Sequence, residues 1–325
     1  MQYVRLGNCG LMVSRLGLGA MGFGSKSWRG WVLEIEESRA IVDHALRAGI
    51  NFFDTCDYYS GGRSEEILGE VLLDRVNRAD VVLATKVGMN MGPGPNDRGF
   101  SRKHLIAAVE ASLKRLRTDY IDLYQTHIWD GSTNIEEMME AFDHLVRNGK
   151  VLHIGVADMP AWQFSKAMHI AERHGWARFV SVQNHYNLVY REDERELLPL
   201  CRDQGIGLVC YSPMARGFLA GNRTTDDWGT TVRAKTDDFA QNMYFREADF
   251  EVARRVSEVA AKINVQPVQV ALAWVLSRPG MTAPIFGATA IDHVDHAVAA
   301  LDIHLDADDC KYLEQAYQPR PLPGG

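Results

Sequence analysis

Eight short apolar segments, each followed by a segment with the periodicity of an amphipathic helix, constrain the fold of this 325-residue chain more than any other feature. Such segments are typical of buried strands in a parallel sheet that is covered on both faces, and eight β/α units are the number that closes a TIM barrel. The sequence therefore predicts a (β/α)8 TIM barrel. The expected strands cover residues 16–19, 51–53, 81–85, 121–125, 151–156, 180–183, 207–211 and 283–286.

Further elements are expected before, between and after these strands. Residues 3–6 and 11–13 flank the turn-forming sequence Gly7-Asn8-Cys9-Gly10, which predicts an N-terminal β-hairpin. The longest irregular stretches are residues 88–99 and 217–248, and long loops in a compact domain are more often functional than idle. We expect residues 1–325 to form a single domain with extra C-terminal helices. The expected helices cover residues 36–48, 64–73, 101–116, 135–148, 161–174, 192–204, 250–263, 268–277, 291–300 and 306–317.

An open, doubly wound sheet is the alternative architecture. In that fold a G-x-G-x-x-G fingerprint connects the first strand directly to a helix. Here the turn at residues 19–24 is rich in glycine, but it lacks the fingerprint and does not lead directly into a helix. The barrel is therefore favoured.

Composition excludes several classes of function. A formal net charge of −7 argues against general binding of nucleic acid or of acidic membranes, and the hydrophobic fraction of 46% is enough for a large core. We expect no membrane segment, because no stretch approaches the roughly 20 apolar residues of a span. The five cysteines include no C-x-x-C pair, which favours a reduced, cytoplasmic protein. No metal site is expected, because His293 and His296 stand beside aspartates on what reads as a solvated helix face.

Polar side chains follow three successive strands of the predicted barrel. Asp54, Lys86 and His127 come at the ends of the second, third and fourth strands, and Tyr59 lies in the loop after the second. Each one alone has an ordinary structural explanation, such as a turn cap or a partly solvated lysine. Neighbouring parallel strands lie about 4.8 Å apart, and active sites of TIM barrels lie at this end of the strands. We therefore expect these four side chains to converge on a catalytic site.

Motifs along nearly the whole chain resemble those of the aldo-keto reductase superfamily, in the bacterial and fungal form with a long loop after strand seven. They read, in order, FFDTCDYY, VVLATKVG, DYIDLYQTHIWD, VLHIGVAD, VQNHYN, LVCYSPMARGFLAG and APIFGAT. The resemblance implies an (α/β)8 barrel, a nicotinamide cofactor and reversible interconversion of a carbonyl compound and an alcohol. It also implies that Asp54, Tyr59, Lys86 and His127 are the catalytic tetrad.

The chemistry independently requires a set of this kind. Hydride transfer to a carbonyl carbon develops an alkoxide, so a proton donor must stand at the oxygen. Tyr59 is the expected donor, and an ammonium about 4 Å away would lower its pKa by about three units, with burial opposing part of that shift. Lys86 is expected to supply this charge, Asp54 to hold Lys86, and His127 to orient the carbonyl.

The resemblance also implies a cofactor site. The ring of Tyr211 is expected to stack on the nicotinamide, Gln183 to bind its carboxamide, and backbone amides of residues 212–217 to approach the pyrophosphate. The residues expected to bind the cofactor are Gly19, Met21, Gln183, Tyr211, Ser212, Pro213, Met214, Arg216, Gly217, Arg233, Gly287, Thr289 and His293.

Two departures from the family pattern bear on this cofactor. Ala157-Asp158 stands where the family usually has Ser-Asn, so binding of the carboxamide depends more on Gln183. Ala290, His293 and Ala297 stand in the region where the family often has an Arg or Lys for the 2′-phosphate. Arg233 is the expected substitute. We therefore expect NADPH as the cofactor, with only a modest preference over NADH.

Substrate identity and assembly are less constrained. Loops that contain Trp28, Trp31, Met89 and Trp129 are expected to line the substrate pocket, which suits a small-molecule carbonyl compound that is flat or apolar, or a sugar ring stacked on indole. The sequence leaves the oligomeric state and the physiological substrate open. A second hypothesis is a cofactor-binding regulatory subunit of the same fold, similar to the potassium-channel β subunits.

Overall fold

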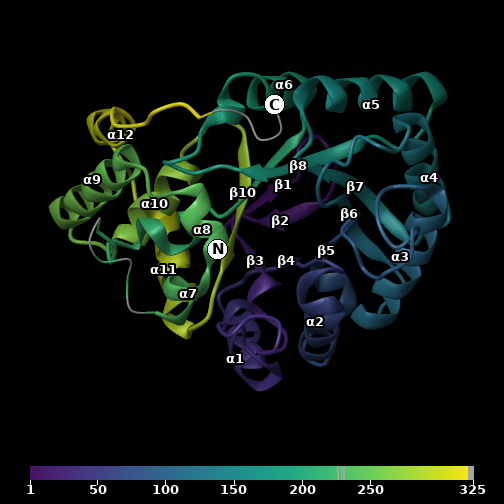
Figure 1. The fold of residues 1–325 in the computed structure, drawn as a ribbon, viewed down its shortest axis with the longest axis horizontal. Coiled ribbons are helices and arrows are strands. Elements are labelled where there is room, and N and C mark those ends of the chain that lie inside the picture. Colours follow the sequence, from purple (N-terminus) through teal and green to yellow (C-terminus); the bar gives the residue numbers. More distant parts are fainter. Residues whose placement is uncertain (225–226, 228, 230, 321–325) are drawn as a thin grey trace.

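Eight parallel strands close into a barrel in the computed structural model, which describes residues 1–224, 227, 229 and 231–320. The strands pair in the order of the chain, and the last pairs with the first. Helices surround them on the outside (Figure 1). The prediction of a (β/α)8 barrel is confirmed. The barrel strands are β3 (Gly17–Gly19), β4 (Phe52–Asp54), β5 (Val82–Val87), β6 (Ile121–Thr126), β7 (Val151–Ala157), β8 (Phe179–His185), β9 (Gly207–Tyr211) and β10 (Met281–Gly287).

The surrounding helix α4 (Ile135–Arg147) illustrates how the sequence buries an apolar face. In α4 the buried positions include Met138, Met139 and Phe142, at the three- to four-residue spacing of one helix face, and the side chain of Asn134 caps the first turn. The other helices are α1 (Ile35–Arg47), α2 (Arg63–Leu73), α3 (Arg102–Leu116), α5 (Ala161–His174), α6 (Leu197–Gln204), α7 (Val232–Thr236), α8 (Asp238–Met243), α9 (Glu247–Ile263), α10 (Pro267–Leu276), α11 (Ile291–Ala299) and α12 (Ala307–Glu314).

The predicted N-terminal hairpin covers the N-terminal end of the barrel. Its antiparallel strands are β1 (Tyr3–Arg5) and β2 (Met12–Ser14). Leu6 packs with side chains of the barrel interior such as Phe52. Gly7 has a φ of +61°, and a Cβ atom there would lie 2.5 Å from the backbone nitrogen of Gly207, so a residue with a side chain would force the hairpin away from the barrel. This end of the barrel is therefore closed.

Two expectations about elements after β8 are wrong in detail. The helix expected over residues 192–204 begins at Leu197, because Glu192 is buried and accepts a hydrogen bond from the backbone N–H of Arg320, 2.6 Å away. Residues 217–248, expected to be irregular, contain the short helices α7 and α8, whose first turns are capped by the side chains of Thr231 and Asp237. In both cases a tertiary contact or a cap outweighed the local pattern.

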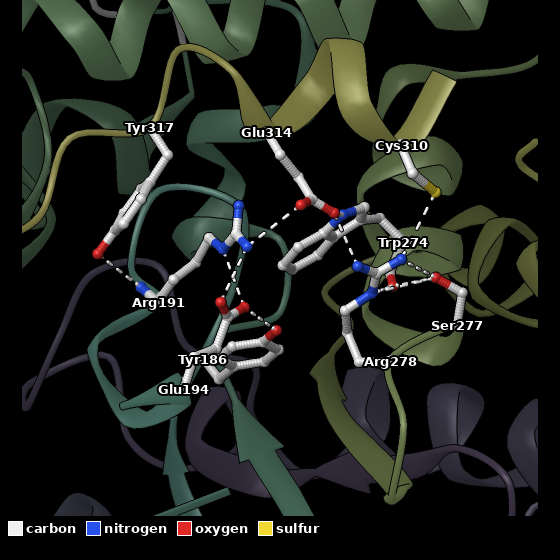
Figure 2. A network of polar contacts seen from close by, with 9 residues as sticks. All are labelled: Tyr186, Arg191, Glu194, Trp274, Ser277, Arg278, Cys310, Glu314 and Tyr317. Carbon is white, nitrogen blue, oxygen red and sulfur yellow. Dashed lines mark hydrogen bonds and ion pairs between the residues drawn. The ribbon is translucent and has the colours of Figure 1, made fainter. Parts of the chain in front are cut away.

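One carboxylate of the C-terminal helix α12 connects it to several parts of the chain. Glu314 accepts hydrogen bonds from Trp274 of α10 at 2.9 Å and from Arg278 at 2.7 Å, and it binds Arg191 at 3.2 Å (Figure 2). Arg191 also binds Glu194, so it connects α12 to the segment after β8. This network lies outside the barrel.

Among the described residues, no single helix combines the length and the apolar content of a membrane span; α9 and α10 taken together meet that criterion but are bent by 98° relative to one another.

Candidate functional site

The four predicted catalytic residues come from adjacent parts of the barrel. Asp54 is the last residue of β4, Lys86 lies near the end of β5, and His127 directly follows β6. Tyr59 begins a short 3₁₀ helix, Tyr59–Gly62, in the loop after β4. Since β4 pairs with β5 and β5 with β6, all four residues lie at the C-terminal end of neighbouring strands.

Lys86 and Asp54 form a buried ion pair at the base of this site. The Nζ atom of Lys86 lies 2.8 Å from Oδ1 of Asp54 and 3.0 Å from the carbonyl oxygen of Thr55, and both charged side chains are almost completely buried. Burial alone would lower the pKa of Lys86, but the Asp54 carboxylate outweighs it and the pKa is raised. Lys86 is therefore a fixed positive charge.

Tyr59 lies above this charge. The centre of its ring is 5.5 Å from Nζ of Lys86 and 5.5 Å from the centre of the His127 ring, which stands perpendicular to it. Burial raises the pKa of the Tyr59 phenol, and Lys86 opposes that rise. The expected net lowering of this pKa is thus wrong for the protein alone, because burial of the phenolate outweighs the charge that stabilises it.

His127 is held neutral by its surroundings. Burial, helped by the charge of Lys86, lowers its pKa to about 3. Its Nδ1 atom lies 2.9 Å from Sγ of Cys56, which itself lies 3.2 Å from Oδ1 of Asp57. Cys56 and Asp57 belong to the motif that carries Asp54 and Tyr59, but nothing in their spacing distinguishes them from buried structural residues.

Gln183 of β8 contacts the carboxylate of this ion pair. Its side-chain amide donates one N–H to Oδ1 of Asp54 at 2.7 Å, which leaves its second N–H and its oxygen for a carboxamide. Gln125 of β6 also donates to Asp54, at 3.4 Å. These two amides and Lys86 together hold the carboxylate in one orientation.

Tyr211, at the end of β9, is fixed by two groups. Its hydroxyl donates to Oδ2 of Asp158 at 3.1 Å, and its ring stacks on His185 with 5.3 Å between the ring centres. Burial raises the pKa of Asp158 to about 7. Asp158 has a φ of +48°, a region that Asp tolerates better than most residues. The sequence marked Asp158 as a departure from the family but did not predict its bond to Tyr211.

Three arginines gather after β9 around one buried carboxylate. Arg216 makes a two-point contact with Asp237, at 2.8 and 3.0 Å, and Arg233 reaches the same carboxylate at 3.1 Å. Arg233 also lies 4.3 Å from the centre of the Trp31 ring. Nε of Arg223 is buried and has no hydrogen-bond partner among the described residues. Arg216 and Arg233 are among the residues that the sequence predicts to bind the cofactor, and Arg223 belongs to the same basic loop. The sequence analysis missed Asp237, although its spacing of four residues from Arg233 could have suggested it.

This cluster fits an anionic ligand. One carboxylate neutralises one of three guanidinium groups, and burial, together with repulsion from Arg216, lowers the pKa of Arg233 to about 10. Both observations indicate an excess of buried positive charge, which an anionic ligand would neutralise. In the neighbouring turn, Ser212, Arg216 and Gly217 all have positive φ. The N–H groups of Ala215 and Gly217 donate to carbonyls within this turn, so those two amides are already engaged.

The remaining predicted cofactor residues lie at the same end of the barrel. Gly19 of β3 pairs with Asp54 on one side and with Gly287 of β10 on the other. The backbone N–H of Thr289 donates to Nδ1 of His293 at 3.2 Å, and burial lowers the pKa of His293, so this histidine is neutral. Met21 is partly exposed in the turn after β3, and the remaining residues, Pro213 and Met214, belong to the turn after β9.

The predicted substrate residues separate into distinct groups. Trp28 lies beside Tyr59, with 6.5 Å between the centres of the two rings. Trp31 is buried under Arg233, on the side of the arginine cluster. Trp129 stacks on Phe100 with 6.1 Å between ring centres, and Met89 is partly exposed after β5. Of the four, Trp28 has the closest connection to the tetrad. Across the described part of the chain, no group of three or more His, Cys, Asp or Glu side chains is arranged to hold a metal ion.

Comparison with known proteins gives one consistent family. The model of the aldo/keto reductase family matches residues 15–318. The chain is 40% identical to versiconal hemiacetal acetate reductase of Aspergillus parasiticus, over 100% of this chain and 99% of that protein. It is 38% identical to an aldo-keto reductase of Fusarium vanettenii (99% and 92% covered) and 39% identical to one of Metarhizium robertsii (99% and 92% covered).

Proposed function

Because the chain belongs to the aldo/keto reductase family, we propose that it is a cytoplasmic, NADPH-dependent carbonyl reductase. Residues 1–325 would act as one catalytic domain that reversibly reduces an aldehyde or ketone to an alcohol. The observation that carries the proposal is the buried Lys86–Asp54 pair beneath Tyr59, since a fixed ammonium next to a phenol is what proton transfer to a carbonyl oxygen requires. When bound, the cofactor supplies the hydride.

Tyr59 holds the proton that the carbonyl oxygen receives. Burial keeps this phenol protonated in the protein alone, and Lys86 lowers the cost of the phenolate that remains after the transfer. The effect of Lys86 is greatest when negative charge is present on the oxygen of Tyr59. It therefore stabilises the transition state more than the ground state, which is the condition for acceleration.

His127 orients the carbonyl. Its neutral imidazole carries one N–H, and Nδ1 faces Cys56, so Nε2 is the nitrogen left for the substrate oxygen. A second donor at this oxygen would fix the carbonyl with respect to Tyr59 and share the developing charge.

The arginine cluster after β9 supports binding of the phosphate groups of NADPH. Arg216, Arg223 and Arg233 carry an excess of positive charge over Asp237, and an arginine–phosphate pair is typically worth about 1.5–3 kcal/mol. Tyr211, Gln183 and Gly287 would contact the nicotinamide and adenosine ends, as the family resemblance implies.

The proposed substrate is a flat, apolar carbonyl compound. Trp28 stands beside Tyr59 and offers an indole face to such a ring. One relative is named for its action on versiconal hemiacetal acetate, and the relatives reported above are all named as reductases. The regulatory-subunit alternative is therefore not favoured.

The test compares two neighbouring tyrosines. With NADPH and 4-nitrobenzaldehyde, Tyr59→Phe should lower kcat at least about 100-fold while cofactor affinity is retained, because the hydroxyl that gives the proton is gone. Tyr58→Phe is the matched control, since Tyr58 also lies next to Trp28 and should tolerate the loss of its hydroxyl. A larger loss of kcat in Tyr58→Phe than in Tyr59→Phe would overturn the assignment of Tyr59 as the proton donor.

A further inference from the structure

Cys56 lies between the imidazole of His127 and a buried carboxyl group. Its Sγ atom is 2.9 Å from Nδ1 of His127 and 3.2 Å from Oδ1 of Asp57, and it accepts a hydrogen bond from the backbone N–H of Tyr58 at 3.2 Å. Cys56 is fully buried and Asp57 is 1% exposed. Bulk water therefore does not compete for these contacts, and the three side chains form a short chain of hydrogen bonds that ends at the proposed catalytic imidazole.

Counting hydrogen atoms leaves two arrangements of this chain in which every hydrogen has an acceptor, because a proton on Oδ2 of Asp57 would have none among the described residues. The thiol has one hydrogen, and the neutral imidazole has one, on either Nδ1 or Nε2. If the thiol donates to Nδ1 of His127, the imidazole must carry its hydrogen on Nε2, and Asp57 must donate to the sulfur. If the thiol donates to Asp57, the carboxylate accepts without a proton, and Nδ1–H donates to the sulfur. In the second arrangement Nε2 has no hydrogen to give.

The proton on Asp57 thus decides between the two arrangements, and the surroundings of Asp57 favour keeping it. Its Oδ2 atom is buried and has no hydrogen-bond partner among the described residues, which is more costly for a carboxylate than for a neutral carboxyl group. Burial raises the pKa of Asp57 to about 7, and the negative charge of Glu65 contributes to the rise.

The other charged and titratable groups around Asp57 differ in their effect on the pKa of Asp57. Arg115 of α3 opposes the rise, but its Nε already donates to Glu65 of α2 at 2.7 Å. Lys86 of β5 acts on the Cys56 thiol, where its charge opposes the rise in the pKa that burial causes. Tyr124 of β6 has a buried hydroxyl, and burial raises its pKa, so it stays neutral. None of these groups supplies a full positive charge to Asp57.

We propose that Cys56 is a positioning residue that transmits the protonation state of Asp57 to the tautomer of His127. With Asp57 protonated, the thiol donates to Nδ1 and the imidazole presents Nε2–H to the substrate carbonyl. Loss of that proton turns the thiol toward the carboxylate. The imidazole then moves its hydrogen from Nε2 to Nδ1 by exchange with solvent water, so the one proton lost is the one that Asp57 releases. The role of His127 as a donor rests on the proposed function; the relay itself does not.

The relay is tested by ¹⁵N NMR of the histidine side chains without cofactor or substrate. His127 is identified by the signals missing in His127→Gln. We expect Nε2 to be the protonated nitrogen at pH 5.5 and Nδ1 at pH 9, with the exchange centred near pH 7. Cys56→Ala and Asp57→Asn should abolish this pH dependence, and Cys56→Ser should retain it, because a hydroxyl can make the same two hydrogen bonds.

Activity gives the second measurement. Above pH 7, kcat for reduction should fall roughly three- to ten-fold more in the natural protein and in Cys56→Ser than in Asp57→Asn. A His127 tautomer that is the same at pH 5.5 and pH 9, or a change that persists in Cys56→Ala, would overturn the relay whatever the enzyme's reaction. A relay seen by NMR together with an activity profile that Asp57→Asn leaves unchanged would instead count against His127 as the donor to the carbonyl.

Discussion

Lys86 acts on three ionisable groups of the candidate site. It is paired with Asp54, it opposes the rise in the pKa of Tyr59, and it helps to lower the pKa of His127. Each effect follows from one positive charge held in a buried position, where electrostatic interactions are screened less than in water. Its removal should therefore change how the site responds to pH as well as how fast it reacts.

Lys86→Met should lower activity most near neutral pH. Alcohol oxidation requires Tyr59 to lose its proton, and without the ammonium this loss should move to higher pH by about one unit or more. The measurement is kcat for oxidation between pH 6 and 11, under conditions in which hydride transfer limits the rate. A profile of unchanged shape would contradict the role of Lys86. The double variant Asp54→Asn/Lys86→Met is the control, because it removes the carboxylate that the single substitution leaves buried and unpaired.

The convergence of Asp54, Tyr59, Lys86 and His127 could be predicted from sequence because they follow consecutive strands, and the barrel geometry brings strand ends together. The contact of Cys56 with His127 and the pairing of Asp237 with Arg216 could not. Both depend on which side chain fills a particular space between elements, and spacing along the chain does not determine that. The predicted lowering of the pKa of Tyr59 was also wrong, because the sequence does not show how deeply one loop residue is buried.

At the scale of elements, the short helices α7 and α8 hold the arginine cluster. Asp237 caps α8 and at the same time accepts hydrogen bonds from Arg216, in the turn after β9, and from Arg233, in α7. The sequence predicted an irregular stretch here because neither helix is long enough to show a clear apolar period. The cap, which is a local signal, was the available evidence for α8.

Arg233→Ala should remove most of the preference for NADPH over NADH. Arg233 is partly compensated by Asp237, so we expect the natural protein to prefer NADPH by a factor nearer ten than a thousand, and less at high salt. The two dissociation constants can be titrated by quenching of tryptophan fluorescence, since Trp31 lies under Arg233. Lys235→Ala is the matched control, because Lys235 is an exposed cation on the same helix. Tighter binding of NADH, or a large preference that survives Arg233→Ala, would show that the phosphate lies elsewhere.

At the scale of the whole molecule, the alternation of strands and helices determined the architecture. All eight predicted strands are present, displaced by at most a few residues, and the pairing of β10 with β3 follows once eight β/α units are arranged in one direction around a barrel. Long-range contacts of single residues, such as that of Glu192 with the segment before the C-terminus, were beyond prediction because they join parts of the chain that no local pattern relates.

Folding buries much of the carboxyl group of Asp158, and that should appear in the stability of the whole protein. Burial raises the pKa of Asp158 to about 7 from an ordinary value of 3.8. A group whose pKa is raised on folding stabilises the folded state fully below the lower value, and this contribution is lost as pH rises through the higher one. The amide of Asp158→Asn cannot ionise, so the variant should not lose this stability. Its unfolding free energy minus that of the natural protein should therefore increase by about 1–2 kcal/mol from pH 5 to pH 8. Asp158 is partly exposed, which reduces the size of this increase. Urea unfolding of both proteins at the two pH values measures this difference.

Asp119→Asn, at an exposed position, is the control. Its unfolding free energy should differ from that of the natural protein by the same amount at both pH values. A gain for Asp158→Asn that is equal at pH 5 and pH 8 would mean that Asp158 is ionised in the folded protein throughout this range.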